Sequence, residues 1–189
     1  MKIVPAILTN NLQEFDDLMA RIVVSKKFDR VQVDFIDGEY TNNKTITPSQ
    51  VNSAFRMDAH LMVVENNLQE YLKYANKFNR VIVQVESVAS PENYDSLALD
   101  IHSPIEAVEP YLENLKYLNL MAIEPGFGGQ ELDLKIFENL SYLSNLRNLR
   151  HLSFLIGVDG GVEQKHLKRL EELGVDEVVV GAARVLEWK

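Results

Sequence analysis

Short runs rich in β-branched residues alternate along this chain with segments of helical periodicity, and this alternation limits the fold more than any other feature. Repeated strand and helix units predict a parallel sheet with right-handed crossovers. Eight such units favour a closed (β/α)8 TIM barrel, an α/β fold, over its competitor, a doubly wound open sheet. The eight expected strands lie in KIVPAIL, RVQVDFI, MDAHLMV, RVIVQVE, LALDIH, LNLMAIE, LSFLIGV and DEVVVGAARVL.

The segments between these strands predict an incomplete ring of helices. After the fourth strand, SPENYDS is too short for a full helix, and the chain ends at Lys189 without room for an eighth one. We therefore expect helix 4 to be shortened and helix 8 to be missing. Barrel surface left bare in this way would need a cover, and a homo-oligomer is one candidate. Helical segments are expected at 11–27, 48–55, 66–78, 103–115, 132–149 and 163–173.

Composition indicates how many domains the chain forms and which classes of partner it binds. A chain of 189 residues, 46% of them hydrophobic, suits one domain, 1–189, with one core. A net charge of −9 without a dense Lys/Arg cluster argues against nucleic acid and anionic membranes as partners. The absence of cysteine excludes a disulfide framework. The N-terminus shows no signal-peptide pattern, so we expect a cytoplasmic protein.

Polar residues inside the expected strands predict a site in the barrel. Because side chains alternate along a strand, Val31, Val33 and Phe35 suit the helix side and Asp34 then points inward. A single inward polar residue is readily explained as an internal hydrogen-bonded group. Several charged groups near the carboxyl ends of strands are harder to explain as packing, since burying charge is costly. The expected cluster is Asp34, His60, Glu86 and Asp159, with Asp58, Met62 and Gln84 also facing inward.

Glycine-rich turns follow the last three expected strands: PGFGGQ, DGGV and GAA. Such turns at neighbouring strand ends can aim backbone amides at one point, where a phosphate group binds. The plainer interpretation is that they are only tight turns between strands and helices. We favour an anion site because three of them lie at the same end of the barrel.

The motifs PAILT, VQVDFIDG, DAHLM, EPGFGGQ, VDGG and VVGAA, taken in this order, resemble the ribulose-phosphate 3-epimerases over nearly the whole chain. The resemblance implies a ribulose-phosphate-binding barrel that interconverts D-ribulose 5-phosphate and D-xylulose 5-phosphate, or acts on a closely related ketose phosphate. It implies that Asp34 and Asp159 exchange the C3 proton and, with His60, bind a divalent metal, and that Met62 and Met121 line the enediolate. The residues it implies around the phosphate are Gly126, Gly128, Gly129, Gly160, Gly161, Gly181 and Ala182.

The chemistry accounts for these residue types. Removing a proton beside a ketone requires a base and a positive group near the developing oxyanion, and inversion at carbon requires groups on both faces. Histidine with carboxylates suits Zn, Mn or Fe. Gln32 stands where the family has a histidine ligand, and an amide oxygen is a weak neutral ligand, so we expect weak metal affinity. Ala182 also replaces a serine of the phosphate site.

Two other functions remain open from the sequence. A sugar-phosphate-binding barrel without turnover is consistent with Gln32 and with the missing eighth helix. A decarboxylase or hexulose-phosphate synthase reaction on a similar phosphate is less consistent, because such relatives carry an Asp-x-Lys-x-x-Asp motif and the segment DFID has no lysine.

Overall fold

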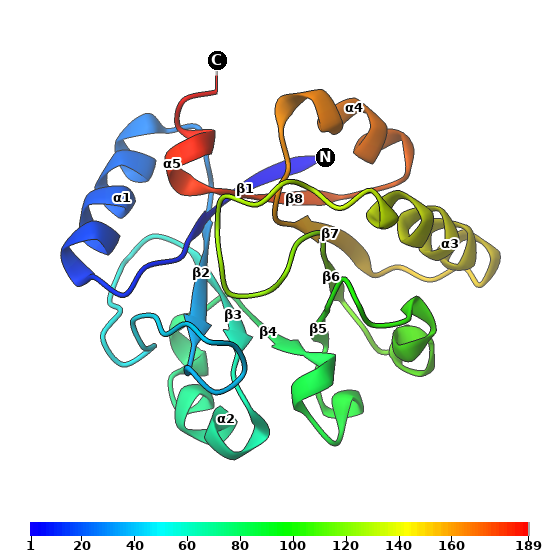
Figure 1. The fold of residues 1–189 in the computed structure, drawn as a ribbon, viewed down its shortest axis with the longest axis horizontal. Coiled ribbons are helices and arrows are strands. Elements are labelled where there is room, and N and C mark those ends of the chain that lie inside the picture. The colour runs from blue at the N-terminus through cyan, green and yellow to red at the C-terminus, as the bar shows by residue number, and fades with distance from the viewer. Residues whose placement is uncertain (189) are drawn as a thin grey trace.

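The computed structural model describes residues 1–188, in which eight parallel strands close into one barrel (Figure 1). The strands follow each other around the barrel in sequence order, and β8 pairs with β1. The predicted (β/α)8 barrel is confirmed, and the open-sheet alternative is wrong. The strands are β1 Lys2–Ile7, β2 Val31–Ile36, β3 Met57–Met62, β4 Arg80–Gln84, β5 Ser96–Leu99, β6 Tyr117–Met121, β7 Leu155–Asp159 and β8 Glu177–Gly181.

Helices surround the strands unevenly, with α1 to α4 placed around the outside of the ring (Figure 1). The α-helices are α1 Leu12–Ser25, α2 Glu65–Leu72, α3 Lys135–Leu149, α4 Gln164–Glu172 and α5 Ala182–Val185, and the 3-10 segments are η1 Ala75–Lys77, η2 Val85–Ser87, η3 Pro91–Asn93 and η4 Ile105–Tyr111. Only two 3-10 turns, η2 and η3, lie between β4 and β5, as the short segment after the fourth strand predicted. Within residues 1–188, β8 is followed by the single turn α5.

Local sequence explains where α1 begins and which face it buries. The Asn11 side chain accepts hydrogen bonds from the backbone of Gln13 and Glu14, which satisfies two free amides of the first turn. Phe15, Met19 and Ile22 follow at helical spacing and are buried against the barrel.

The helix expected at 48–55 does not form, and that prediction is wrong. Side chains in this segment bond the backbone instead, because Ser53 accepts from Phe55 N and Gln50 accepts from Thr47 N. The ammonium group of Lys77, from η1, binds three of its carbonyl oxygens at 2.8 to 3.3 Å. The backbone is therefore satisfied without helical hydrogen bonds.

The segment 103–115 differs from expectation in the type of helix. It forms the 3-10 helix η4 and not an α-helix. Pro110 lies inside it and has no amide hydrogen to donate, which interrupts an α-helical pattern. Ile105 and Val108 still bury their side chains, so the segment covers its part of the barrel.

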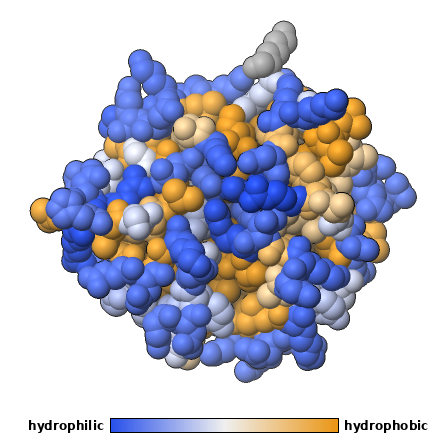
Figure 2. Space-filling model, turned by 180° about the vertical axis from the view of Figure 1, so that it is seen from behind, coloured by the Kyte–Doolittle hydropathy of each residue, from blue (hydrophilic) through white to orange (hydrophobic). Residues whose placement is uncertain are grey.

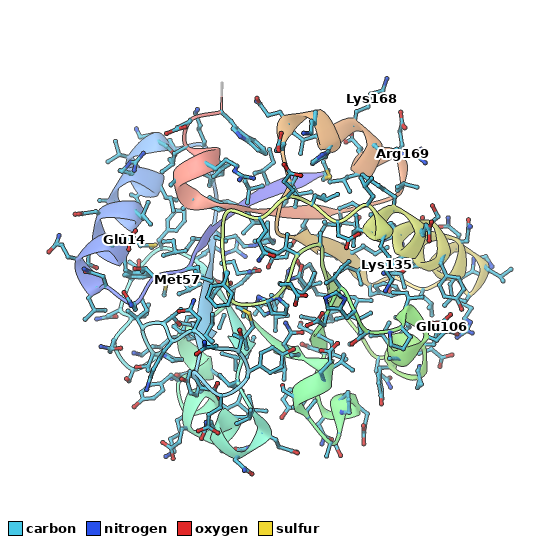
Figure 3. All side chains as sticks on the ribbon, in the orientation of Figure 1. Glu14, Met57, Glu106, Lys135, Lys168 and Arg169 are labelled. Carbon is cyan, nitrogen blue, oxygen red and sulfur yellow. The ribbon has the colours of Figure 1, made fainter. Side chains whose placement is uncertain are left out.

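Side chains fill the centre of the ring of strands, so the barrel is a packed core and not a channel (Figure 3). At the amino-terminal end of the strands, four charged side chains form ion pairs. Arg30 Nε lies 2.9 Å from Asp58 Oδ2, and Arg80 Nη1 lies 2.9 Å from Glu177 Oε2. Arg30 also pairs with Glu177. Asp58 therefore faces inward as predicted, at the end of the barrel opposite Asp34 and Asp159.

The outer surface is mixed in character. Figure 2, seen from behind, shows several separate hydrophobic areas among hydrophilic side chains. In the described part of the chain, no helix combines the length and the apolar character that a membrane crossing needs.

Candidate active site

Asp34, His60 and Asp159 meet inside the barrel, as the strand alternation predicted. Asp34 and His60 are paired across β2 and β3, and Asp159 ends β7. His60 Nδ1 lies 3.5 Å from Asp34 Oδ1 and 3.5 Å from Asp159 Oδ2. All three side chains are buried, and one ligand atom of each lies within 4.8 Å of the other two.

Gln32 turns its amide nitrogen toward this cluster. Gln32 Nε2 donates to Asp34 Oδ1 at 2.8 Å and to Asp159 Oδ2 at 2.7 Å, and it lies 3.4 Å from His60 Nδ1. The sequence predicted a weak oxygen ligand at this position. In the structure a hydrogen-bond donor faces the carboxylates instead.

A second layer of amides holds the cluster from below. The side-chain oxygen of Gln84 accepts from His60 Nε2 at 3.1 Å. The Gln84 amide is oriented in this way because its nitrogen can then donate to Ala98 O and Glu86 Oε2, both at 3.2 Å. Nε2 therefore carries a proton, and Nδ1 is the ring nitrogen on the side of the two carboxylates. Asn119 Nδ2 donates to Asp159 Oδ2 at 3.1 Å.

The charges in the cluster shift the pKa values of its members. Burial lowers the pKa of His60, but hydrogen bonds to Asp159 and Asp34 and their charges outweigh burial and raise it to about 9. Burial raises the pKa of Asp34, and the charge of Asp159 adds to this effect against the hydrogen bond to His60. The protein thus stabilises a proton within the cluster, in a place where acid–base chemistry could use it.

A cavity of about 340 Å³ opens above the cluster at the carboxyl ends of the strands. Asp34 and Asp159 line it, whereas His60 and Gln32 lie beneath, at 0% and 1% exposure. Every residue that the sequence assigned to proton transfer or to the phosphate lines this one cavity. These are Asp34, Asp159, Met62, Met121, Gly126, Gly128, Gly129, Gly160, Gly161, Gly181 and Ala182.

The loop after β6 is held in place by polar contacts and contains a glycine in a left-handed conformation. Gln130 Nε2 donates to the carbonyl oxygens of Glu124 and Phe127 at 2.9 and 2.7 Å. Asn43, from the loop after β2, donates to Gly126 O at 2.6 Å. Gly126 has φ +96°, and a Cβ there would lie 2.5 Å from Thr41. The wall of the cavity is therefore preformed.

Glu86 does not join the cluster, and that prediction is wrong. β4 ends at Gln84, so Glu86 falls in the turn η2, where the alternation of the strand no longer applies. Its side chain is exposed and accepts from Asp100 N and Ser103 Oγ. It lines a separate depression together with His102 and other residues.

Three further side chains lie at or near the cavity, and the sequence assigned none of them a role there. Asn119 shares the inward parity of Met121 on β6, so the same alternation could have found it. Arg184 lines the cavity two residues after Ala182. Glu14, labelled on α1 in Figure 3, lines it as well. The last two come from helices, where sequence spacing does not predict contact with the barrel mouth.

The donor set fits a divalent cation. A nitrogen and two carboxylate oxygens with the spacing found here match the ligands of Zn, Mn or Fe, which bind such atoms at about 2.0 to 2.2 Å. The hydrogen bond from His60 Nε2 to Gln84 is the type of support that orients a metal-binding histidine. Gln32 is the exception, because its amide nitrogen has no lone pair to offer.

Fold and site together define a parallel barrel with two buried aspartates and a histidine next to a glycine-lined cavity, and comparisons with known proteins show its family. A sequence model of the "Ribulose-phosphate 3 epimerase family" matches residues 2–185. The chain is 30% identical to "Ribulose-phosphate 3-epimerase" of Helicobacter pylori, covering 96% of this chain and 89% of that protein. It is 25% identical to the Bacillus subtilis protein of the same name, covering 97% and 91%. The chain belongs to the ribulose-phosphate 3-epimerase family.

Solved structures of other families share the fold alone. The tryptophan synthase complex from Pyrococcus furiosus aligns with a TM-score of 0.61 at 12% identity, over 96% of this chain and 87% of that chain. The tryptophan synthase alpha subunit from Campylobacter jejuni aligns with a TM-score of 0.59 at 14% identity, over 98% and 90%.

Proposed function

We propose that this chain is a metal-assisted epimerase that interconverts D-ribulose 5-phosphate and D-xylulose 5-phosphate, or a closely related ketose phosphate, at C3. One observation carries the proposal: Asp34 and Asp159 reach the same cavity from β2 and β7, beside the glycine-rich loops. Family membership supports the substrate class. In this proposal the two aspartates are the acid/base pair.

The proton balance requires both aspartates. One carboxylate accepts the proton from C3, and the electrons of that bond move toward the C2 carbonyl to give an enediolate. The other aspartate, protonated at the start, donates its proton to the opposite face of C3. The reverse reaction exchanges the two roles.

Other residues would bind and orient the sugar. A divalent ion held by Asp34, His60 and Asp159 would supply positive charge to offset the charge on the substrate oxygens. Met62 and Met121 line the cavity and would keep water from the reacting carbon. Backbone amides of the three glycine-rich loops would bind the phosphate.

Proton NMR in deuterated buffer tests the proposal. With D-ribulose 5-phosphate and added Zn²⁺, we expect deuterium at C3 and the appearance of D-xylulose 5-phosphate. Asp34→Asn should abolish both, because it removes an acid/base group from one face of C3 and also one proposed ligand of the ion that offsets the enediolate charge. Asp16→Asn, at an exposed position on α1, is the matched control and should leave both unchanged.

The absence of C3 exchange in the wild type with every added metal would contradict the epimerase. The alternative is then a catalytically impaired sugar-phosphate-binding barrel. One observation favours this alternative: Gln32 presents a donor, and not a ligand, to the carboxylates. Saturable binding of D-ribulose 5-phosphate without exchange would support it.

A further inference from the structure

Gln32 occupies a central place in the barrel that the epimerase chemistry does not explain. Its side chain is 1% exposed, and its Nε2 lies within 3.4 Å of one ligand atom from each of Asp34, His60 and Asp159. A buried primary amide has two N–H donors, and here each of the two carboxylates accepts one of them. Gln32 therefore links the two carboxylates directly.

This link reduces the repulsion between the two carboxylates, as a bound cation would. Two carboxylates this close repel each other, and burial strengthens the repulsion. The N–H bonds of Gln32 place partial positive charge between them, and hydrogen bonds to ionised acceptors are stronger than neutral ones. Asn119 adds a third N–H, at Asp159 Oδ2. The two aspartates are held in position by the side chains of this chain alone.

The same arrangement opposes a metal ion. A cation bonded at about 2 Å to His60 Nδ1 and to both carboxylate oxygens would contact the NH2 group of Gln32. That group has no lone pair and turns its hydrogens toward the cation, so the contact would be repulsive. To admit the ion, the amide must rotate and present its oxygen, which breaks both hydrogen bonds to the carboxylates.

We propose that Gln32 is a positioning residue that competes with the metal. Its amide holds Asp34 and Asp159 together in a stable metal-free form, and metal binding requires this amide to rotate so that its oxygen faces the ion. The inference rests on the four side chains and not on any substrate. It makes Gln32 the reason for the weak metal affinity that we expect, through competition as well as through poor ligation.

Removing the amide distinguishes competition from ligation. Gln32→Met keeps a similar length but has neither donor nor carbonyl oxygen. If Gln32 competes, Gln32→Met should bind Mn²⁺ at least about tenfold more tightly than the wild type in calorimetric titration, since breaking a charge-assisted hydrogen bond costs roughly a factor of ten or more. Gln32→His, which supplies a lone pair, should bind more tightly still. The same titrations in a His60→Ala background should lose the signal, which assigns it to this site.

Thermal unfolding provides a second readout. After treatment with EDTA, the wild type should be more stable than Gln32→Met, because the variant leaves the carboxylates unlinked. Saturating Mn²⁺ should then raise the melting temperature of Gln32→Met by more than that of the wild type. Weaker Mn²⁺ binding by Gln32→Met, with equal melting temperatures without metal, would overturn the proposal and make Gln32 an ordinary oxygen ligand.

A measurement on the wild type keeps the proposal testable if Gln32→Met does not fold. In a ¹⁵N NMR spectrum of the metal-free protein, the side-chain NH2 of Gln32 should give a pair of signals protected from exchange with solvent, as expected for a buried donor with two acceptors. Zn²⁺ should shift this pair and remove its protection. A Gln32 NH2 that exchanges rapidly in the metal-free protein would contradict the proposal. None of these outcomes depends on epimerase activity.

Discussion

Asn119 Nδ2 donates to Asp159 Oδ2 at 3.1 Å, and this is the same oxygen that accepts from Gln32. The side-chain oxygen of Asn119 accepts in turn from the hydroxyl of Tyr117 at 3.2 Å. All of these side chains are buried, so each polar atom depends on a protein partner. Asn119 thus connects a proposed acid/base residue to the packed interior of the barrel.

We predict that Asn119→Ala lowers the free energy of unfolding by about 1–3 kcal/mol, because Asp159 and Tyr117 each lose a buried partner. C3 exchange should also slow, since Asp159 loses one of its constraints. Urea unfolding and the deuterium assay measure the two effects. Asn114→Ala, at an exposed position, is the control and should change neither. An Asn119→Ala protein as stable as this control would contradict the prediction.

The ion pairs at the other end of the barrel predict a dependence of stability on pH. Burial raises the pKa of Glu177, but hydrogen bonds from Arg30 and Arg80 and their charges outweigh it and lower the pKa overall. A carboxyl with a lowered folded pKa stabilises the protein above its unfolded pKa of about 4.3, and this contribution is lost as the pH falls through the folded pKa. The contribution of Glu177 to stability should therefore decrease below about pH 4.3.

Glu177→Gln tests this dependence. It should remove part of the loss of stability on acidification and cost about 3–5 kcal/mol at neutral pH, because Arg30 and Arg80 keep only Asp58 as a buried partner. Glu172→Gln breaks only an exposed pair with Arg169 and should cost less than about 1 kcal/mol. Urea titrations across the acid range measure both variants. Equal costs for the two would show that burial of the pair does not matter.

The sequence predicted the barrel and most of the cluster because both depend on short-range patterns. Alternation along β2 and β3 places Asp34 and His60 on the same side of neighbouring strands without further information. The same rule gave a wrong result for Glu86, since β4 ends two residues earlier and a 3-10 turn replaces the alternation. Periodicity is informative only as far as the element extends.

What the sequence could not predict depends on partners far along the chain. The segment 48–55 has some helical periodicity, but Lys77 satisfies its carbonyl oxygens and a helix becomes unnecessary. Which atom of Gln32 faces the cluster depends on Asp159, which is 127 positions away. Position in the sequence fixes that an amide lies there, and only the assembled barrel fixes its orientation.

Two glycines of the proposed phosphate site differ in what they tolerate. Gly161 has φ +67°, and a Cβ there would lie 2.4 Å from the backbone nitrogen of Leu132. At Gly128 no atom lies within 4 Å of an added Cβ. We predict that Gly161→Ala costs at least about 1–2 kcal/mol of stability and that Gly128→Ala costs little. Thermal unfolding of both variants checks this, and a Gly128→Ala protein that is the less stable of the two would contradict it.

Arg184 is the one cationic side chain among the residues that line the cavity within residues 1–188. It follows Ala182 by two positions, and its Nη1 lies 3.4 Å from Val162 O, a weak contact that a bound anion would readily replace. If the phosphate binds here, the guanidinium supplies charge that backbone amides lack. We predict that Arg184→Gln raises KM for D-ribulose 5-phosphate about tenfold or more and leaves kcat within a small factor, since the phosphate is remote from C3.

The ionic strength dependence separates this role from packing. Competition by inorganic phosphate should weaken in Arg184→Gln and become less sensitive to salt, because a charge–charge interaction has been removed. Arg169→Gln removes an exposed arginine outside the cavity and should leave KM, phosphate inhibition and salt dependence unchanged. If Arg184→Gln lowers thermal stability but keeps the wild-type KM, Arg184 is a packing residue and the phosphate is bound by the backbone alone.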